Sequence, residues 1–279
     1  MNVRTVNYTD SNAPHEFTRS LRETGFSVLI HHSIPKHLVD EVYSEWKEFF
    51  RSDAKTNYKF DPIKQDGFFP FGTENEKGCQ TKDLKEFYHI YLWGHYPVEI
   101  SSATIELYGR LVELTSVLLG WIQDETPDHV KSLFSIPLPE MIKKSKTNLL
   151  RILHYPPLDG EEAPGAIRGA AHEDINLITL LVAGTQPGLQ VQDLNNKWHD
   201  VPCDHGSLAI NSGDMLQEAS NGYFPSTTHQ VINPGAGIQN ESRYSMPLFL
   251  HPRDEVVLSD RYTAREYLDE RLVEIGLRS

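Results

Sequence analysis

The chain is poor in cysteine, in basic residues and in long apolar runs, and each shortage excludes a class of protein. Its 279 residues include two cysteines, Cys79 and Cys203. They are far apart and lack C-x-x-C spacing, so we expect neither a disulfide framework nor a thiolate zinc site. No stretch approaches the ~18 apolar residues of a membrane span, and residues 1–8 begin no secretory signal. We therefore predict a cytoplasmic protein without membrane insertion.

The shortage of basic residues excludes a nucleic-acid partner. The chain has 26 Lys and Arg against 39 Asp and Glu, which gives a formal net charge of -13. Phosphate binding requires clustered basic side chains, and this acidic chain does not offer them. We expect a small-molecule substrate and no membrane partner, and the sequence does not indicate an oligomeric state.

A histidine–acid motif at residues 172–174 is the most informative feature that is present. On a strand, alternate side chains share one face, so His172 and Asp174 are expected to project together. A further histidine, His229, lies in the β-prone stretch 227–232. Two imidazoles and one carboxylate on one side of a metal leave its other positions open, which suits non-haem Fe(II). We predict that these three residues bind a metal; the alternative is a surface pair plus a hydrogen-bonded core histidine.

The run that follows the motif supports a buried position for it. Residues 175–182 are mostly apolar with β-branched members and are bounded by Gly184 and Pro187. Such a run is typical of a buried strand. The motif is therefore expected at the mouth of a strand inside a β scaffold.

A second i, i+2 pair, Arg243 and Ser245, opens the apolar run 243–250. An inward-facing arginine in such a strand is costly unless it meets an anion, and its planar fork suits a carboxylate. Tyr155, at the end of the run 149–155, can donate a phenolic hydrogen bond to the same acid. Taken alone, Arg243 would be read as a structural ion-pair partner and Tyr155 as core.

With H-x-D at His172 and Asp174, the distal histidine at His229 and R-x-S at Arg243 and Ser245, the chain resembles a known family. This is the isopenicillin N synthase-like group of Fe(II)/2-oxoglutarate-dependent dioxygenases, and the resemblance covers nearly the whole chain. Other similar segments lie within residues 21–30, 67–86, 188–202 and 211–222.

The resemblance implies a site and a reaction. Fe(II) would be held by the triad, 2-oxoglutarate would chelate it, and O2 would take the last position. Arg243, Ser245 and Tyr155 would hold the distal carboxylate of 2-oxoglutarate. The implied reaction oxidises a small molecule, by default through hydroxylation, and releases succinate and CO2. Two departures concern the acid and substrate contacts: Leu153 stands where relatives place asparagine, and Gln230 where arginine is frequent.

Alternatives stay open at this point. One is an iron-dependent oxidase of the same fold that draws electrons from its substrate or from ascorbate instead of 2-oxoglutarate. Another is a non-catalytic metal-binding module, while zinc hydrolysis lacks an H-E-x-x-H base. Arg168, just before the motif, would favour a carboxylate-bearing substrate if it faced the pocket. It is equally well read as solvated or paired with Glu161 or Glu162.

The predicted fold is mainly β with helices: a double-stranded β-helix, or jelly roll, flanked by N-terminal helices and one C-terminal helix. Turn-separated short strands recur from Asn148 onward, which favours this class. We divide the chain into an N-terminal mixed region at 1–122, the jelly-roll core at 123–261 and a C-terminal helix at 262–279, a lid or a dimer contact. Apolar spacing predicts helices at 16–23, 33–50, 101–122 and 262–277, and a strand at 26–31.

Overall fold

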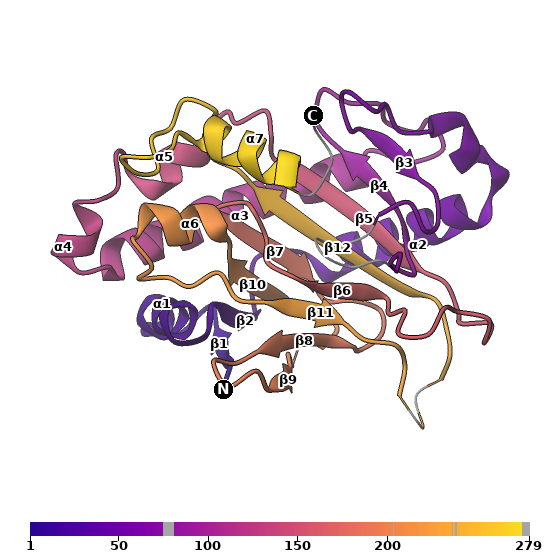
Figure 1. The fold of residues 1–279 in the computed structure, drawn as a ribbon, viewed down its shortest axis with the longest axis horizontal. Coiled ribbons are helices and arrows are strands. Elements are labelled where there is room, and N and C mark those ends of the chain that lie inside the picture. Colours follow the sequence, from indigo (N-terminus) through magenta and orange to yellow (C-terminus); the bar gives the residue numbers. More distant parts are fainter. Residues whose placement is uncertain (75–80, 203, 236, 238, 275–279) are drawn as a thin grey trace.

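Two β-sheets face each other and form the centre of the molecule (Figure 1). The computed structural model describes residues 1–74, 81–202, 204–235, 237 and 239–274. The large sheet contains, in pairing order, β1 (Arg4–Asn7), β2 (Phe26–Ile30), β10 (Leu208–Ser212), β7 (Ile178–Val182), β12 (Arg243–Leu250), β5 (Leu149–Tyr155), β4 (Glu86–Ile90) and β3 (Gly67–Phe69). The small sheet contains β6 (Gly169–His172), β11 (His229–Val231), β8 (Leu189–Gln192) and β9 (Trp198–Asp200).

Every strand pairing in both sheets is antiparallel except the parallel pair β1–β2. Strands distant in sequence are neighbours, since β10 pairs with β7 and β2, and β12 pairs with β5 and β7. This arrangement confirms the predicted class, mainly β with helices around a jelly-roll core. The strands of the N-terminal region extend both edges of the large sheet, while the division at residues 122 and 261 stays a prediction.

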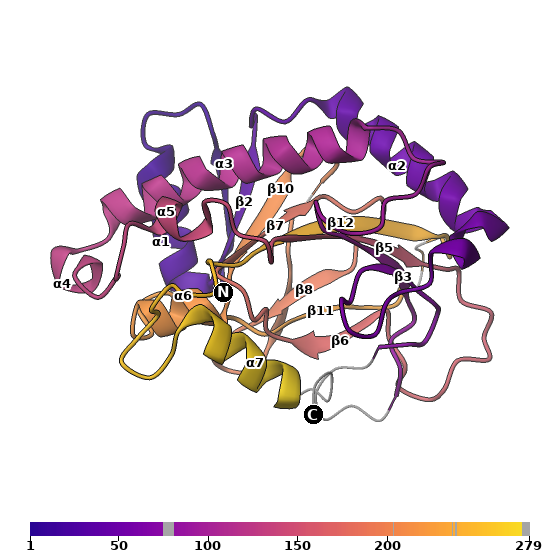
Figure 2. The ribbon, with the colours of Figure 1, turned by 90° about the horizontal axis from the view of Figure 1, so that it is seen from above.

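α2 (Lys36–Arg51) and α3 (Ala103–Glu125) cover the outer face of the large sheet, on the side away from the small sheet (Figure 2). The other helices are α1 (Ala13–Thr24), α4 (Asp128–Lys131), α5 (Leu138–Ile142), α6 (Asp214–Ala219) and α7 (Ala264–Glu274), with a 3-10 turn η1 (Asp53–Tyr58). Trp46 of α2 is fully buried and donates its indole N–H to Thr104 of α3 over 2.9 Å. The predicted apolar stripes of α2 and α3 thus form one core with the sheet.

The helix boundaries differ from the predicted ones by a few residues, with local causes. α1 begins at Ala13 because Pro14 is placed in its first turn, where a missing N–H costs nothing. α2 begins after Pro35, which is its N-cap rather than part of the helix. α7 begins at Ala264, and residues 275–279 of the predicted helix lie outside the described residues, as do Lys77, Gly78, Cys79 and Cys203.

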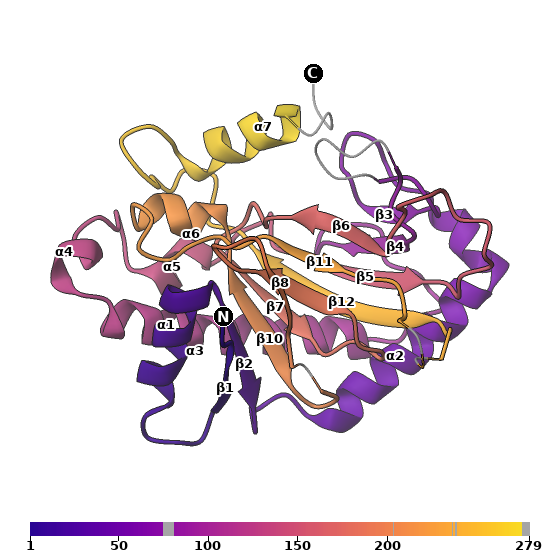
Figure 3. The same ribbon diagram turned by 60° about the horizontal axis from the view of Figure 1, so that its bottom comes forward.

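α7 lies outside the two sheets, beyond α6 (Figure 3). Three of its side chains, Arg265, Leu268 and Leu272, line the same cavity as residues 172–176. α7 therefore borders this cavity, and its role as a lid or a dimer contact stays a prediction. Among the residues that the structure describes, no helix combines the length and apolar character needed to cross a membrane.

Gly25 joins α1 to β2 and touches the segment that leads into β11. Its φ is +70°, a left-handed conformation that favours glycine, and its N–H caps the helix by donating to Leu21 O. A Cβ at Gly25 would stand 2.2 Å from Thr227 Oγ1 and 2.8 Å from Pro225 O. The small size of Gly25 therefore lets the chain before His229 pack against the end of α1.

Gly25→Ala is expected to lower the free energy of unfolding by about 2 kcal/mol or more, because left-handed backbone alone costs roughly 1–2 kcal/mol and the clash adds to it. The matched control is Gly109→Ala in α3, where a Cβ meets nothing within 4 Å. That variant should gain about 0.4–1 kcal/mol. Urea unfolding of both variants checks the prediction, and equal effects at the two glycines would contradict it.

Candidate metal centre

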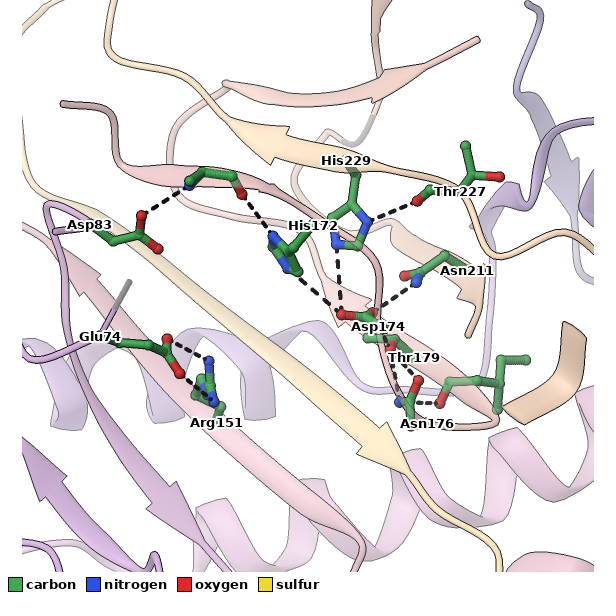
Figure 4. A network of polar contacts seen from close by, with 12 residues as sticks. Glu74, Asp83, Arg151, His172, Asp174, Asn176, Thr179, Asn211, Thr227 and His229 are labelled. Atoms are coloured by element: carbon green, nitrogen blue, oxygen red, sulfur yellow. Dashed lines mark hydrogen bonds and ion pairs between the residues drawn. The ribbon is translucent and has the colours of Figure 1, made fainter. Parts of the chain in front are cut away.

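Three side chains converge between the sheets: His172, Asp174 and His229 (Figure 4). The Nε2 atoms of His172 and His229 lie 3.8 Å and 3.7 Å from Asp174 Oδ1. One ligand atom from each residue lies within 4.8 Å of the other two. Asp174 and His229 are buried, and His172 is partly exposed, so the group has one open side.

The two histidines come from paired strands. In the antiparallel register of β6 with β11, His172 stands directly opposite His229, and their ring centroids are 4.4 Å apart. Asp174 lies beyond the end of β6, in the connection to β7. The expectation that His172 and Asp174 align by alternation along one strand is therefore wrong, because the strand ends at His172. The connection itself turns the carboxylate toward the imidazoles.

Backbone contacts from the start of α6 hold that connection in place. Asp214 N donates to Asp174 O over 2.7 Å, and Met215 N donates to Asn176 O over 3.1 Å. Gly213 lies so close that a Cβ there would stand 2.2 Å from Asn176 O and 2.8 Å from Asp174 O. A glycine at this position is thus required for the connection to pack against α6.

Hydrogen bonds fix which oxygen of Asp174 faces the imidazoles. Oδ2 accepts from Thr179 Oγ1 at 2.6 Å and from Asn211 Nδ2 at 2.8 Å. Burial opposes ionisation of Asp174, but the positive charge that each imidazole carries when protonated, together with these hydrogen bonds, outweighs burial, so the pKa of Asp174 lies below the usual value. The carboxylate is therefore ionised at neutral pH, with Oδ1 directed at the histidines.

The imidazoles are oriented in the same way. His172 Nδ1 donates to Ala170 O at 2.8 Å, and His229 Nδ1 donates to Thr227 O at 3.1 Å. A carbonyl oxygen only accepts, so each proton sits on Nδ1 and each Nε2 lone pair faces Asp174 Oδ1. Burial and the nearby His172 lower the pKa of His229 to about 4, which keeps that ring neutral and able to bind a metal.

The donor set is two nitrogens and one oxygen. Within the described ranges, no fourth histidine, cysteine or acidic side chain joins the group. Glu173, the nearest other acid in sequence, accepts from Thr228 Oγ1 at 2.7 Å instead. Two imidazoles and one carboxylate with open positions fit non-haem Fe(II), whereas a structural zinc site would be closed by a fourth ligand.

The second predicted group also comes together. β12 pairs with β5 so that Arg243 stands opposite Tyr155, and the guanidinium lies 5.1 Å from the centroid of the tyrosine ring. Arg243 is 2% exposed, donates Nη1–H to Ser245 Oγ at 3.1 Å and Nε–H to Gln186 O at 3.0 Å. No ion pair of Arg243 is found in the part of the chain that the structure describes. Tyr155 thus offers its ring face to Arg243.

Arg168 does not line the cavity beside the triad. It is 2% exposed, donates Nη2–H to Glu241 O at 2.7 Å, and lines a separate cavity of about 330 Å³ together with Arg243. It is therefore not a solvated side chain, and among the described contacts it pairs with neither Glu161 nor Glu162.

The cavity that contains His172 and Asp174 has a volume of about 650 Å³. Sequence reasoning missed its polar wall. Arg151 of β5 donates Nη1–H and Nη2–H to the two oxygens of Glu74 at 3.2 and 3.3 Å (Figure 4). It also donates Nε–H to His89 Nε2 at 2.8 Å. Arg151 lies four residues before Tyr155 on the same strand face. That spacing is the only signal for Arg151 in the sequence, because Glu74 and His89 are remote from it.

A chain of polar contacts through the buried Lys85 connects this polar wall to His172. Lys85 Nζ lies 2.7 Å from a carboxylate oxygen of Glu74 and 2.7 Å from one of Asp83. Asp83 Oδ1 accepts from Ala170 N at 3.1 Å, and the carbonyl of the same Ala170 accepts from His172. Burial opposes ionisation of Glu74, but the positive charges of Arg151 and Lys85 hold its pKa well below the usual value. Glu74 is thus ionised within a closely packed cluster.

Comparison with known proteins identifies the family. Residues 146–252, which carry the triad and Arg243, match the model of the 2OG-Fe(II) oxygenase superfamily. Residues 8–101 match the N-terminal model described as non-haem dioxygenase in morphine synthesis. A crystal structure from Shewanella oneidensis assigned to the oxygenases is 52% identical, with a TM-score of 0.90 and 99% of each chain covered. The chain belongs to the 2OG-Fe(II) oxygenase superfamily.

More distant members agree with this assignment. Gibberellin 2-beta-dioxygenase 3 of Arabidopsis thaliana is 26% identical over 90% of this chain and 75% of its own length. The fold is shared with a Neurospora crassa protein crystallised with alpha-KG and thymine, at a TM-score of 0.80 and 20% identity over 97% and 96% of the two chains. The superfamily oxidises substrates with Fe(II), 2-oxoglutarate and O2, and yields succinate and CO2. The predicted family, enzyme class and cofactors are thereby confirmed.

Asp174→Ala is expected to abolish stoichiometric Fe(II) binding and activity while the fold is retained, because it removes the one anionic donor of the triad. Metal titration and circular dichroism of the purified variant check this. Glu173→Ala is the matched control, since that carboxylate points to Thr228 and should leave iron binding intact. Tight stoichiometric Fe(II) binding by Asp174→Ala would contradict the prediction.

Proposed function

We propose that His172, Asp174 and His229 are the iron ligands of this dioxygenase. The observation that carries the proposal is the convergence of two Nε2 atoms and one Oδ1 atom, each oriented by hydrogen bonds at the other end of its group. The donor set fits Fe(II) and leaves positions for a chelating acid and O2. When bound, iron and 2-oxoglutarate supply the activation of dioxygen and the oxidation of a C–H bond.

We further propose that Arg243, Ser245 and Tyr155 bind the distal carboxylate of 2-oxoglutarate. Arg243 is buried without an acidic partner among the described residues, and a buried guanidinium in that state is costly unless an anion is bound. Hydrogen bonds to Gln186 O and Ser245 Oγ hold the guanidinium of Arg243 in a fixed orientation, and the ring of Tyr155 packs against it. The chain's part in the reaction is to hold the cosubstrate in place and exclude water.

We infer that the substrate is a small molecule bound in the cavity of about 650 Å³ beside His172, and that hydroxylation is the reaction. Cavities of about 300–1,000 Å³ are typical of small-ligand sites. Two similar proteins, a gibberellin dioxygenase and a protein crystallised with thymine, support a small organic substrate. The requirement for ferrous iron favours the reducing cytoplasm, and ascorbate as a further reductant stays a prediction.

The polar wall of this cavity favours a neutral group on the substrate. Among the described residues of the cluster, Arg151 and Lys85 carry two positive charges, and Glu74 and Asp83 carry two negative ones, so these charges are equal in number. Of the five N–H donors of a guanidinium, Arg151 uses three within the chain, which leaves two for a ligand. A carbonyl oxygen can accept from these donors without adding an unbalanced charge.

The rest of the lining agrees with a partly apolar substrate. Tyr91, Trp93 and Phe249 line the cavity, and the guanidinium of Arg151 lies 5.4 Å from the ring centroid of Phe249. At the rim, Arg265 is itself paired with Asp254 and Asp269. We propose a carbonyl-bearing, uncharged small molecule.

A screen of paired compounds tests this substrate class. Each pair has one skeleton, once as a carbonyl compound or amide and once as the free carboxylate, and succinate release with Fe(II) and 2-oxoglutarate is measured. We expect turnover with neutral members, and loss of that turnover by at least tenfold in Arg151→Leu. Turnover confined to the carboxylates would refute the substrate class but leave the reaction itself in place.

Arg243→Leu is expected to raise the dissociation constant of 2-oxoglutarate at least tenfold, about 1.4 kcal/mol, because the counter-charge of the distal carboxylate is lost. Fe(II) affinity should change little, since Arg243 is not one of the three converging residues. Calorimetry with Mn(II) in place of iron measures the cosubstrate directly. Arg110→Leu, at an exposed arginine of α3, is the control, and an unchanged constant in Arg243→Leu would count against the role.

A further inference from the structure

A second guanidinium is buried beside that of Arg243. Arg168, at the residue before β6, and Arg243, at the start of β12, line the same cavity of about 330 Å³, and each is 2% exposed. Arg168 is one of the largest fully buried side chains of the protein. Two buried like charges therefore share one small space.

The charge of Arg168 is not balanced within the described part of the chain. Its Nη2–H donates to the backbone oxygen of Glu241, and its buried Nε has no hydrogen-bond partner. Arg243 in turn uses a backbone oxygen and a hydroxyl. The contacts of both guanidinia are thus neutral acceptors, which satisfy hydrogen bonds but do not compensate charge.

Two carboxylates line the same cavity, and neither reaches these arginines among the described contacts. Asp200 and Asp204 are both exposed, and Asp200 accepts from the side chain of Gln190 at 2.9 Å. Burial lowers the pKa of Arg168, and the charge of Arg243 lowers it further, as expected for a cation without a counter-ion. A side chain at Gly184 would clash with the guanidinium of Arg243, since a Cβ at Gly184 would lie 2.8 Å from Arg243 Nη2. The absence of a side chain at this position leaves room for the guanidinium.

Arg168 and Arg243 differ in this respect from Arg151, whose positive charge is compensated by Glu74. A compensated arginine suits a neutral ligand group, whereas two uncompensated ones require an anion. The anion has to be small, because the cavity has a volume of only about 330 Å³. It also has to accept hydrogen bonds from both guanidinium groups. A carboxylate offers two oxygens and about four lone-pair sites, enough for both.

We propose that Arg168 is a second cationic contact, beside Arg243, for the distal carboxylate of 2-oxoglutarate. The inference rests on the proposed role of Arg243. It changes the role expected for Arg168 from a substrate contact to a cosubstrate contact. Arg168 then determines specificity for a 2-oxo acid that carries a second carboxylate, over one that ends in a methyl group.

The test compares two ligands that differ only at the distal end: 2-oxoglutarate, and 2-oxopentanoate, which has a methyl group in place of the distal carboxylate. Calorimetry with Mn(II)-loaded protein gives both affinities without turnover. The variant is Arg168→Met, which keeps much of the side-chain volume and removes the charge. Arg168→Lys restores the charge, and Arg110→Met is the surface control.

We expect Arg168→Met to bind 2-oxoglutarate at least tenfold more weakly, about 1.4 kcal/mol, with little change for 2-oxopentanoate. Arg168→Lys should regain part of the preference. Without ligand, Arg168→Met should unfold no more easily than the Arg110→Met control, because it removes a buried, uncompensated charge.

Three outcomes would overturn the inference. The first is an unchanged ratio of the two affinities in Arg168→Met, and the second is an equal loss of affinity for both ligands. The third is a variant that fails to fold, which would show that Arg168 stabilises the jelly-roll core. If wild-type protein loaded with Mn(II) does not bind 2-oxoglutarate, the proposed function itself fails. The two failures are therefore distinguishable.

Discussion

The structure depends most on how one carboxylate is fixed. Asp174 is buried, and a buried carboxylate is stable only when its oxygens are satisfied. Thr179 and Asn211 satisfy Oδ2 from β7 and β10, two neighbouring strands of the large sheet. The connection that carries Asp174 is itself bound to the start of α6, where Gly213 allows close contact. The large sheet thus positions the acid, and the small sheet positions both imidazoles.

Much of this could be predicted from the sequence. His172, Asp174 and His229, together with Arg243, Ser245 and Tyr155, were predicted as neighbours from spacing and resemblance. Alternation along a strand holds for Arg243 and Ser245, which both lie in β12. The four longest helices, α1, α2, α3 and α7, were predicted because their apolar residues recur at helical spacing, whereas the short helices α4, α5 and α6 were missed. The strand assignment for Asp174 failed since an apolar run does not reveal where β6 ends and the connection begins.

What the sequence could not supply are contacts between remote segments. Glu74 and Arg151 are 77 residues apart and meet only because β3, β4 and β5 are adjacent at one edge of the large sheet. Arg168 looked like a surface or substrate-facing residue, and its burial beside Arg243 depends on how the small sheet closes over β12. In both cases the residue type does not identify the contacting residue, because the sheet topology determines which remote segments are adjacent.

The peptide group of Ala170 has an additional consequence for catalysis. Its N–H donates to Asp83 and its carbonyl accepts from His172, so the anionic end of the Glu74–Lys85–Asp83 cluster acts through a single amide on one of the imidazoles proposed to bind iron. Hydrogen bonds in such a chain polarise one another, and a stronger acceptor at Nδ1 makes Nε2 a more electron-donating ligand. If His172 binds iron as proposed, the donor strength of its Nε2 would depend on the charges of the polar wall.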